Sequence, residues 1–198
     1  MNKPSESRVR LLIVPGLHNS GPTHWQSWLQ ARYPGAVRVE QSDWGEPAID
    51  EWAERLGETL AAAGPGPWLV AAHSFGCLVL ARHLQTQAAT NLRAALLVAP
   101  ADPERFGLEY SLPAEPLPLR CTWVASSNDP WMAFARSRDW AQRWGCRWLN
   151  LGDAGHINVE AGFGPLPLAA RWVEAENQRL EKDRRFERAD LSEWSFAV

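Results

Sequence analysis

The fold is decided by the stretch Trp68-Leu69-Val70-Ala71-Ala72-His73-Ser74-Phe75-Gly76-Cys77. Its first half is a continuous apolar run, which is typical of a strand covered on both faces. Leucines and alanines then recur at helical spacing after Cys77. Ser74 lies between these two patterns, with the small residues Ala72 and Gly76 two positions away on either side. This arrangement predicts a nucleophile elbow, a strained turn that lifts a serine hydroxyl clear of a sheet.

Composition predicts one globular domain that spans residues 1–198. Of the 198 residues, 45% are hydrophobic and 22% are charged, which is ordinary for a globular protein. The formal net charge is −3 and no basic stripe occurs, so nucleic acid is not expected as a partner. The longest apolar runs have the length of strands, so we expect no membrane-spanning segment.

The N-terminus and the cysteines predict a cytoplasmic protein without a zinc site. Residues 1–10 are polar and lead directly into a strand-like run, which does not fit a secretory signal peptide. The three cysteines, Cys77, Cys121 and Cys146, are too few and too scattered for a disulfide framework or a zinc site. We therefore expect a reducing compartment and no zinc site.

Strand-like and helical segments alternate along the chain, which predicts an α/β fold. The arrangement expected is a three-layer αβα sandwich around a mostly parallel sheet of about six strands, with its core in residues 10–180. The strands are expected at 10–15, 36–42, 69–72, 94–100, 121–127 and 147–151, and the helices at 24–33, 48–63, from 76 onward, 131–144 and 168–180. Residues 101–119 are a proline-rich connection with little periodicity.

The tail, residues 181–198, differs from the rest of the chain. It is mostly charged up to Asp190, and Leu191, Trp194, Phe196 and Val198 then make an apolar terminus. A solvated extension of the last helix is the simpler interpretation. The alternative is that the terminal aromatic residues dock on a neighbouring subunit, which would make the protein a homo-oligomer.

Two later strand ends supply an acid and a base for Ser74. A serine hydroxyl needs a neighbouring base to take its proton, and that base needs a third group to orient it. Asp129 follows the strand at 121–127, and His156 lies in the loop after the strand at 147–151. The carboxyl ends of parallel strands share one edge of a sheet. Because the order serine, acid, histidine is that of α/β-hydrolases, we expect these three residues to form a catalytic triad.

Each partner of Ser74 has competitors. Asp129 precedes a proline and could be only a turn or N-cap residue, and His156 could be only a polar loop residue. Asp102 follows the fourth strand and could orient the histidine instead. Strand alternation points the side chain of His73 away from Ser74. The weaker candidates are Asp139 and Asp153 among the acids, and His18, His24, His73 and His83 among the histidines.

An oxyanion hole needs backbone N–H groups aimed at the developing negative charge. Phe75, the residue after the nucleophile, is expected to provide one. Leu17, which follows the turn glycine after the first strand, is expected to provide the other. The same loop carries a rival pattern, Gly16-x-x-x-x-Gly21-Pro22-Thr23, which is similar to a phosphate-binding loop. Pro22 replaces its lysine and offers neither charge nor N–H, so we rank nucleotide binding far lower.

Five short segments carry a resemblance to a known family. They are Val14-Pro15-Gly16-Leu17, Thr23-His24-Trp25, Ala72-His73-Ser74-Phe75-Gly76, Asn128-Asp129-Pro130 and Gly155-His156-Ile157-Asn158. With them the chain resembles, over about residues 10–180, the small serine hydrolases that include retinoblastoma-binding protein nine and its bacterial relatives. The resemblance implies a compact α/β-hydrolase without a cap domain, and Ser74, Asp129 and His156 as its triad.

One feature of the family's human member is not matched. That member is associated with an L-x-C-x-E motif, and the nearest segment here, Leu119-Arg120-Cys121-Thr122-Trp123, has tryptophan in place of glutamate. We therefore expect no retinoblastoma-type partner.

The predicted function is hydrolysis of ester, thioester or amide bonds in small acyl substrates. This hydrolytic mechanism needs neither a metal ion nor an organic cofactor. Without a lid, the site should be open and favour modest apolar acyl groups. The chain has 12 tryptophans; most should be core, and a few near strand ends could line the cleft. One alternative is a catalytically silent hydrolase fold that serves as a binding protein. Another is a non-hydrolytic reaction of the same triad, because one fold hosts several chemistries.

Overall fold

The structure is a computed structural model that describes residues 10–87 and 91–194, with side chains described up to residue 186. The chain divides into two compact units, Met1–Leu166 and Pro167–Val198. Most of the expected polar N-terminus, and the terminal Phe196 and Val198, lie outside the described residues. No helix among the described residues has both the length and the apolar character needed to cross a membrane.

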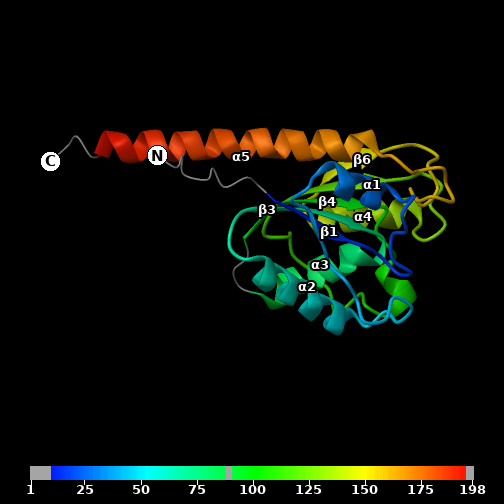
Figure 1. The fold of residues 1–198 in the computed structure, drawn as a ribbon. Coiled ribbons are helices and arrows are strands. Elements are labelled where there is room, and N and C mark those ends of the chain that lie inside the picture. The colour runs from blue at the N-terminus through cyan, green and yellow to red at the C-terminus, as the bar shows by residue number, and fades with distance from the viewer. Residues whose placement is uncertain (1–9, 88–90, 195–198) are drawn as a thin grey trace. The chain divides into compact units, whose positions relative to one another are not determined.

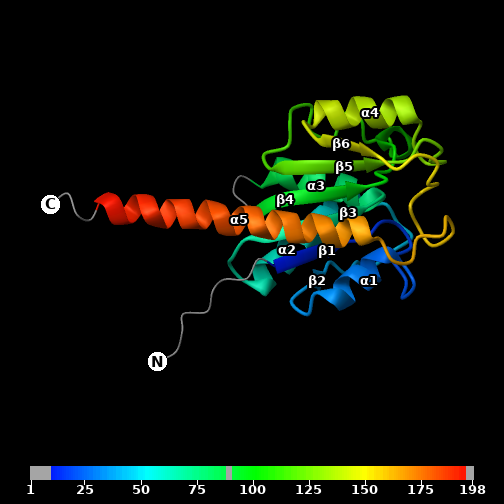
Figure 2. The ribbon, with the colours of Figure 1, turned by 90° about the horizontal axis from the view of Figure 1, so that it is seen from above.

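The first unit is built on a sheet of six strands that are all parallel, as the alternating pattern predicts. The strand order is β2-β1-β3-β4-β5-β6, which Figure 2 shows from above. The strands are β1 (Arg10–Val14), β2 (Val37–Arg38), β3 (Trp68–His73), β4 (Leu92–Val98), β5 (Arg120–Ala125) and β6 (Arg147–Asn150).

Helices cover both faces of this sheet, so the predicted three-layer arrangement is confirmed. Helix α1 lies on one face, and α2 and α3 lie on the other (Figure 1). The helices of the first unit are α1 (Trp25–Arg32), α2 (Ile49–Ala63), α3 (Phe75–Thr86) and α4 (Phe134–Arg143). The proline-rich connection between β4 and β5 contains one short 3-10 helix, Pro103–Phe106, which is too small to be a lid.

Two elements differ in length from their predictions. Strand β2 has two residues, Val37–Arg38, instead of the expected 36–42, because this edge strand pairs only with β1. Helix α5 runs over Pro167–Trp194, past the expected end at residue 180, which agrees with the interpretation of the tail as an extension of the last helix. Residues 181–194 contain many strong helix formers and no glycine or proline, so nothing in them stops the helix.

The core of the first unit is formed by the central strands and the helices that pack on them. Every residue of β3 is buried, as expected for a parallel strand covered on both faces. Six of the 12 tryptophans are buried among the described residues, which is half of them and not the predicted majority. The largest fully buried side chains are aromatic: Trp25, Trp68, Trp123, Trp144 and Phe75.

The end of β1 and the start of α3 approach so closely that two positions admit only glycine. A Cβ atom on Gly76 would lie 2.4 Å from the carbonyl oxygens of both Val14 and Pro15. A Cβ atom on Gly16 would lie 2.8 Å from the Cβ of Ser74. Neither backbone has room to move without separating the strand from the helix. The contact therefore holds the loop after β1 directly against the predicted nucleophile.

We expect Gly76→Ala to lower the free energy of unfolding by about 3 kcal/mol, because the added methyl group meets two backbone oxygens rather than flexible side chains. Chemical denaturation measures this change. Gly35→Ala is the matched control, since nothing lies within 4 Å of its Cβ position, and its stability should change by less than about 1 kcal/mol. Equal stabilities for the two variants would contradict the close approach.

Candidate active site

Ser74 sits in a strained turn between β3 and α3. Its backbone angles are φ 52° and ψ −124°, in the left-handed half of conformational space that residues other than glycine rarely adopt. Its N–H donates to the carbonyl oxygen of Val98 on the neighbouring strand, at 3.1 Å. The turn thus has the strained conformation that the sequence pattern around Ser74 predicts.

The structure brings the three predicted residues together at one edge of the sheet. Nε2 of His156 lies 2.9 Å from Oγ of Ser74. Nδ1 of the same ring lies 3.0 Å from each carboxylate oxygen of Asp129. The side chains of His156 and Asp129 are 9% and 5% exposed, so the pair is shielded from water. A serine, an imidazole and a carboxylate therefore form a continuous hydrogen-bonded chain.

Asp129 also has the local role that its position before a proline suggests. Its Oδ1 accepts the backbone N–H of Trp131 at 2.9 Å, which closes a turn after β5. This bond holds the carboxylate in the position in which it contacts the imidazole of His156. The turn role and the contact with the histidine thus occur together in one residue.

The competing acid, Asp102, is engaged elsewhere. Both of its carboxylate oxygens accept from Arg136 at 2.7 Å, and Oδ1 also accepts the N–H of Glu104. Burial alone would raise the pKa of Asp102, but these hydrogen bonds hold the pKa below its ordinary value. Asp102 is therefore an ion-pair partner of Arg136, whereas Asp129 faces His156.

The loop that carries His156 is held by neutral polar groups. Its backbone has positive φ angles at Gly155 and Ile157. The N–H of Ala154 donates to Oγ of Ser126 at 3.0 Å, and the N–H of Gly155 donates to Oδ1 of Asn128 at 2.7 Å. These bonds join the loop after β6 to the end of β5, next to Asp129.

His73 contributes to the site through its contact with His156, not through Ser74, from which strand alternation points its side chain away. Its ring lines the site, and its Nε2 donates to the backbone carbonyl of His156 at 3.0 Å. Burial lowers the pKa of His73 well below its ordinary value, and a nearby charge on His156 would lower it further. His73 is therefore a neutral donor that ties the last residue of β3 to the predicted base. Alternation describes directions within a strand and cannot account for a loop that folds over its end.

The loop after β1 and the turn at Ser74 contain backbone amides without an acceptor among the described residues. The N–H of His18 donates to the carbonyl oxygen of Trp44, and the N–H of Asn19 donates to the carbonyl oxygen of Gly16. The N–H of Ser20 donates to Oδ1 of Asn19. Among the described residues, neither the N–H of Leu17 nor that of Phe75 has a hydrogen-bond acceptor. Leu17 lines the same cleft as Ser74, and Phe75 is the residue after Ser74 in the chain.

Gln26 supports the loop after β1 through its side-chain hydrogen bonds, and the sequence does not predict this role. The side chain is fully buried, and its amide nitrogen donates to the carbonyl oxygens of Val14 and Ala71 at 3.1 and 2.9 Å. Its Oε1 accepts from the hydroxyl of Ser20 at 2.5 Å. One glutamine thus joins the ends of β1 and β3 to the loop that carries the free amide. A lone Gln in a helix gives no sequence signal for such a role.

A cleft of about 290 Å³ opens over Ser74 and His156. Its apolar wall is formed by Leu17, Phe106 and Trp131. Trp131 is 45% exposed and is the one tryptophan among the described lining residues, so the expectation of a tryptophan in the cleft wall is met by a single residue. A larger hollow of about 760 Å³ lies elsewhere, where Trp68 and Asn91 mark the opposite ends of the strands.

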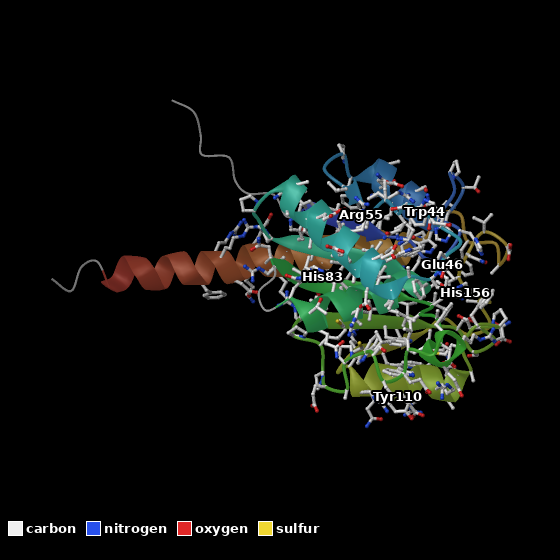
Figure 3. The ribbon with its side chains drawn as sticks, turned by 90° about the horizontal axis from the view of Figure 1, so that it is seen from below. Trp44, Glu46, Arg55, His83, Tyr110 and His156 are labelled. Atoms are coloured by element: carbon white, nitrogen blue, oxygen red, sulfur yellow. The ribbon has the colours of Figure 1, made fainter. Side chains whose placement is uncertain are left out.

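The other candidate histidines lie either in the cleft of His156 or in the larger hollow. His24 and His18 line the same cleft, whereas His83 bonds the carbonyl of Ala53 in the larger hollow. Figure 3 shows His83 well apart from His156. Among the side chains that the structure describes, no group of three or more His, Cys, Asp or Glu could hold a metal ion.

Comparison with known proteins identifies the family. The family model described as serine hydrolase matches residues 11–175. The chain belongs to this serine hydrolase family. A search of the curated proteins gave no match.

Solved structures of relatives have the same fold. A YdeN-like hydrolase from Pectobacterium atrosepticum is 35% identical, with a TM-score of 0.82, over 87% of this chain and 92% of that one. The ydeN gene product of B. subtilis is 21% identical, with a TM-score of 0.71, over 84% and 97%. Esterase 2 of Thermogutta terrifontis, phosphonylated by cyclosarin, is 14% identical, with a TM-score of 0.60, over 91% and 84%. The serine hydrolase has the predicted α/β-hydrolase fold.

Proposed function

We propose that this serine hydrolase cleaves ester, thioester or amide bonds of small acyl substrates, with Ser74 as nucleophile, His156 as base and Asp129 as the orienting acid. The observation that carries the proposal is the chain of contacts from Oγ of Ser74 through the imidazole of His156 to the carboxylate of Asp129. Those distances allow proton transfer without rearrangement.

The reaction runs in two halves. Oγ of Ser74 attacks the carbonyl carbon and forms a C–O bond, while its proton moves to Nε2 of His156. The bond to the leaving group then breaks, and the leaving group takes that proton. A water attacks the acyl-enzyme in the same way, and the acid is released with Ser74 restored. Asp129 stabilises the imidazolium that forms in each half.

The backbone amides of Leu17 and Phe75 form the oxyanion hole in this mechanism. Each is a donor without an acceptor among the described residues; Leu17 lines the cleft with Ser74, and Phe75 follows Ser74 in the chain. Donors of this kind stabilise the tetrahedral intermediate more than the planar carbonyl, so they lower the barrier. Loss of one typically costs about 2.7–4 kcal/mol of transition-state stabilisation.

The cleft supports modest apolar acyl groups as substrates. The volume of about 290 Å³ has room for a small acyl group and part of a leaving group. Phe106 and Trp131 offer apolar surface beside the nucleophile. The short 3-10 helix between β4 and β5 leaves the cleft open.

A fluorophosphonate tests the nucleophile directly, because Ser74 would displace fluoride from phosphorus only if His156 takes its proton. We expect the wild-type protein to be labelled and to hydrolyse p-nitrophenyl butanoate. Ser74→Ala should show no label, and its turnover should fall by at least about 10⁴-fold. Unlabelled wild-type protein would indicate a silent binding fold, and a labelled protein that hydrolyses no ester or amide would indicate a non-hydrolytic reaction.

Two matched substitutions test the acid. Asp129→Asn should lower kcat by about 10⁴-fold, because the amide cannot stabilise the imidazolium and favours the wrong tautomer of His156. Asp102→Asn should keep kcat within about threefold of the wild type, since it weakens only the bonds with Arg136, which also pairs with Glu109, and the asparagine oxygen can still accept the N–H of Glu104. Steady-state kinetics on one ester measure both. The reverse order of effects would move the acid role to Asp102.

A further inference from the structure

His24 is a cleft residue that the proposed mechanism does not use. It precedes α1 and lines the cleft together with Ser74 and His156. The residue is only 5% exposed. Its ring centroid lies 4.8 Å from that of His73, whose own ring lies 4.9 Å from that of His156. Three imidazoles thus lie in sequence from the first loop to the predicted base.

One ring nitrogen of His24 has a structural partner that determines its tautomer. Nδ1 caps α1 by accepting the backbone N–H of Gln26 at 3.1 Å. A backbone N–H can only donate, so Nδ1 carries the lone pair and the hydrogen of the neutral ring is on Nε2. The capping contact therefore makes Nε2 a hydrogen-bond donor.

That donor is free and reachable from the cleft. Among the described residues, Nε2 of His24 has no hydrogen-bond partner, yet it is not one of the fully buried atoms that lack a partner. It therefore retains accessible surface. Because Nδ1 is turned into the N-terminus of α1, the accessible side of the ring is its Nε2 edge, and the cleft is the cavity that His24 lines.

The electrostatics of the cleft favour an uncharged acceptor for this donor. Burial lowers the pKa of His24 to about 4, with Arg38 and His156 adding to the effect, so the ring is neutral near pH 7. No lysine or arginine is among the described lining residues, whereas the carboxylate of Glu160 is. Among the described lining residues, an anionic substrate group would meet a carboxylate and no lysine or arginine.

We propose that His24 is a specificity-determining residue whose Nε2–H donates to a second, uncharged oxygen of the substrate, in addition to the scissile carbonyl. The substrate class is then a neutral ester, thioester or amide with a carbonyl, ether or hydroxyl oxygen in its acyl or leaving group. This inference rests on the proposed catalytic role of Ser74. Leaving Nε2–H unpaired in a filled cleft has a free-energy cost, which is why substrates without this oxygen are disfavoured.

The test variant is His24→Ser, which removes the donor while serine retains a good N-cap for α1. Two pairs of neutral esters probe it. p-Nitrophenyl 4-oxopentanoate and p-nitrophenyl pentanoate differ by an oxygen in the acyl group. 4-Acetylphenyl butanoate and 4-ethylphenyl butanoate differ by an oxygen in the leaving group. Comparing kcat/KM of variant and wild type for each ester cancels the intrinsic reactivity of that ester.

We expect His24→Ser to lower kcat/KM roughly tenfold for the oxygen-bearing member of one pair and less than threefold for its partner. The pair that responds identifies the side of the substrate that His24 contacts. Equal losses within both pairs would overturn the proposal. Fluorophosphonate labelling at the wild-type rate shows that the variant keeps its nucleophile, and hydrolysis that survives in Ser74→Ala would instead reject the proposed function.

Discussion

The site depends on the close approach of β1 to the turn at Ser74. Gly76 lies against the carbonyl oxygens of Val14 and Pro15, and Gly16 lies against Ser74 itself. This packing holds Ser74 at its positive φ, because the end of β1 and the start of α3 leave no room for a wider turn. It also holds the loop that carries Leu17 against the turn that carries Phe75. The proposed nucleophile and the loop of the proposed oxyanion donor Leu17 therefore depend on a single contact between backbones.

Neutral hydrogen bonds fix the loops around that contact. Gln26 joins β1, β3 and the loop after β1, and His73 joins the end of β3 to the carbonyl of His156. Burying neutral groups with their partners satisfied is far less costly than burying charges. Asp129, which contacts His156, has a carboxylate that is shielded from water, with its side chain 5% exposed. In the proposed mechanism, new charge would then arise on His156 and on the substrate.

Much of the fold and the grouping at the site could be predicted from the sequence because local rules determine them. The motif around Ser74 combines two periodicities, and parallel strands place Asp129 and His156 on the same edge as Ser74. Local rules do not predict contacts between distant residues. His73 bonds a carbonyl 83 positions away, and Gln26 bonds one 45 positions away. The length of β2 likewise depended on its single neighbour.

The most direct measurement is a crystal structure of the protein after reaction with a fluorophosphonate. The phosphorus should be bonded to Oγ of Ser74, and its non-bridging oxygen should lie about 2.7–3.1 Å from the backbone nitrogens of Leu17 and Phe75, where an oxyanion would sit. An adduct on another residue, or an oxygen turned away from both amides, would contradict the account.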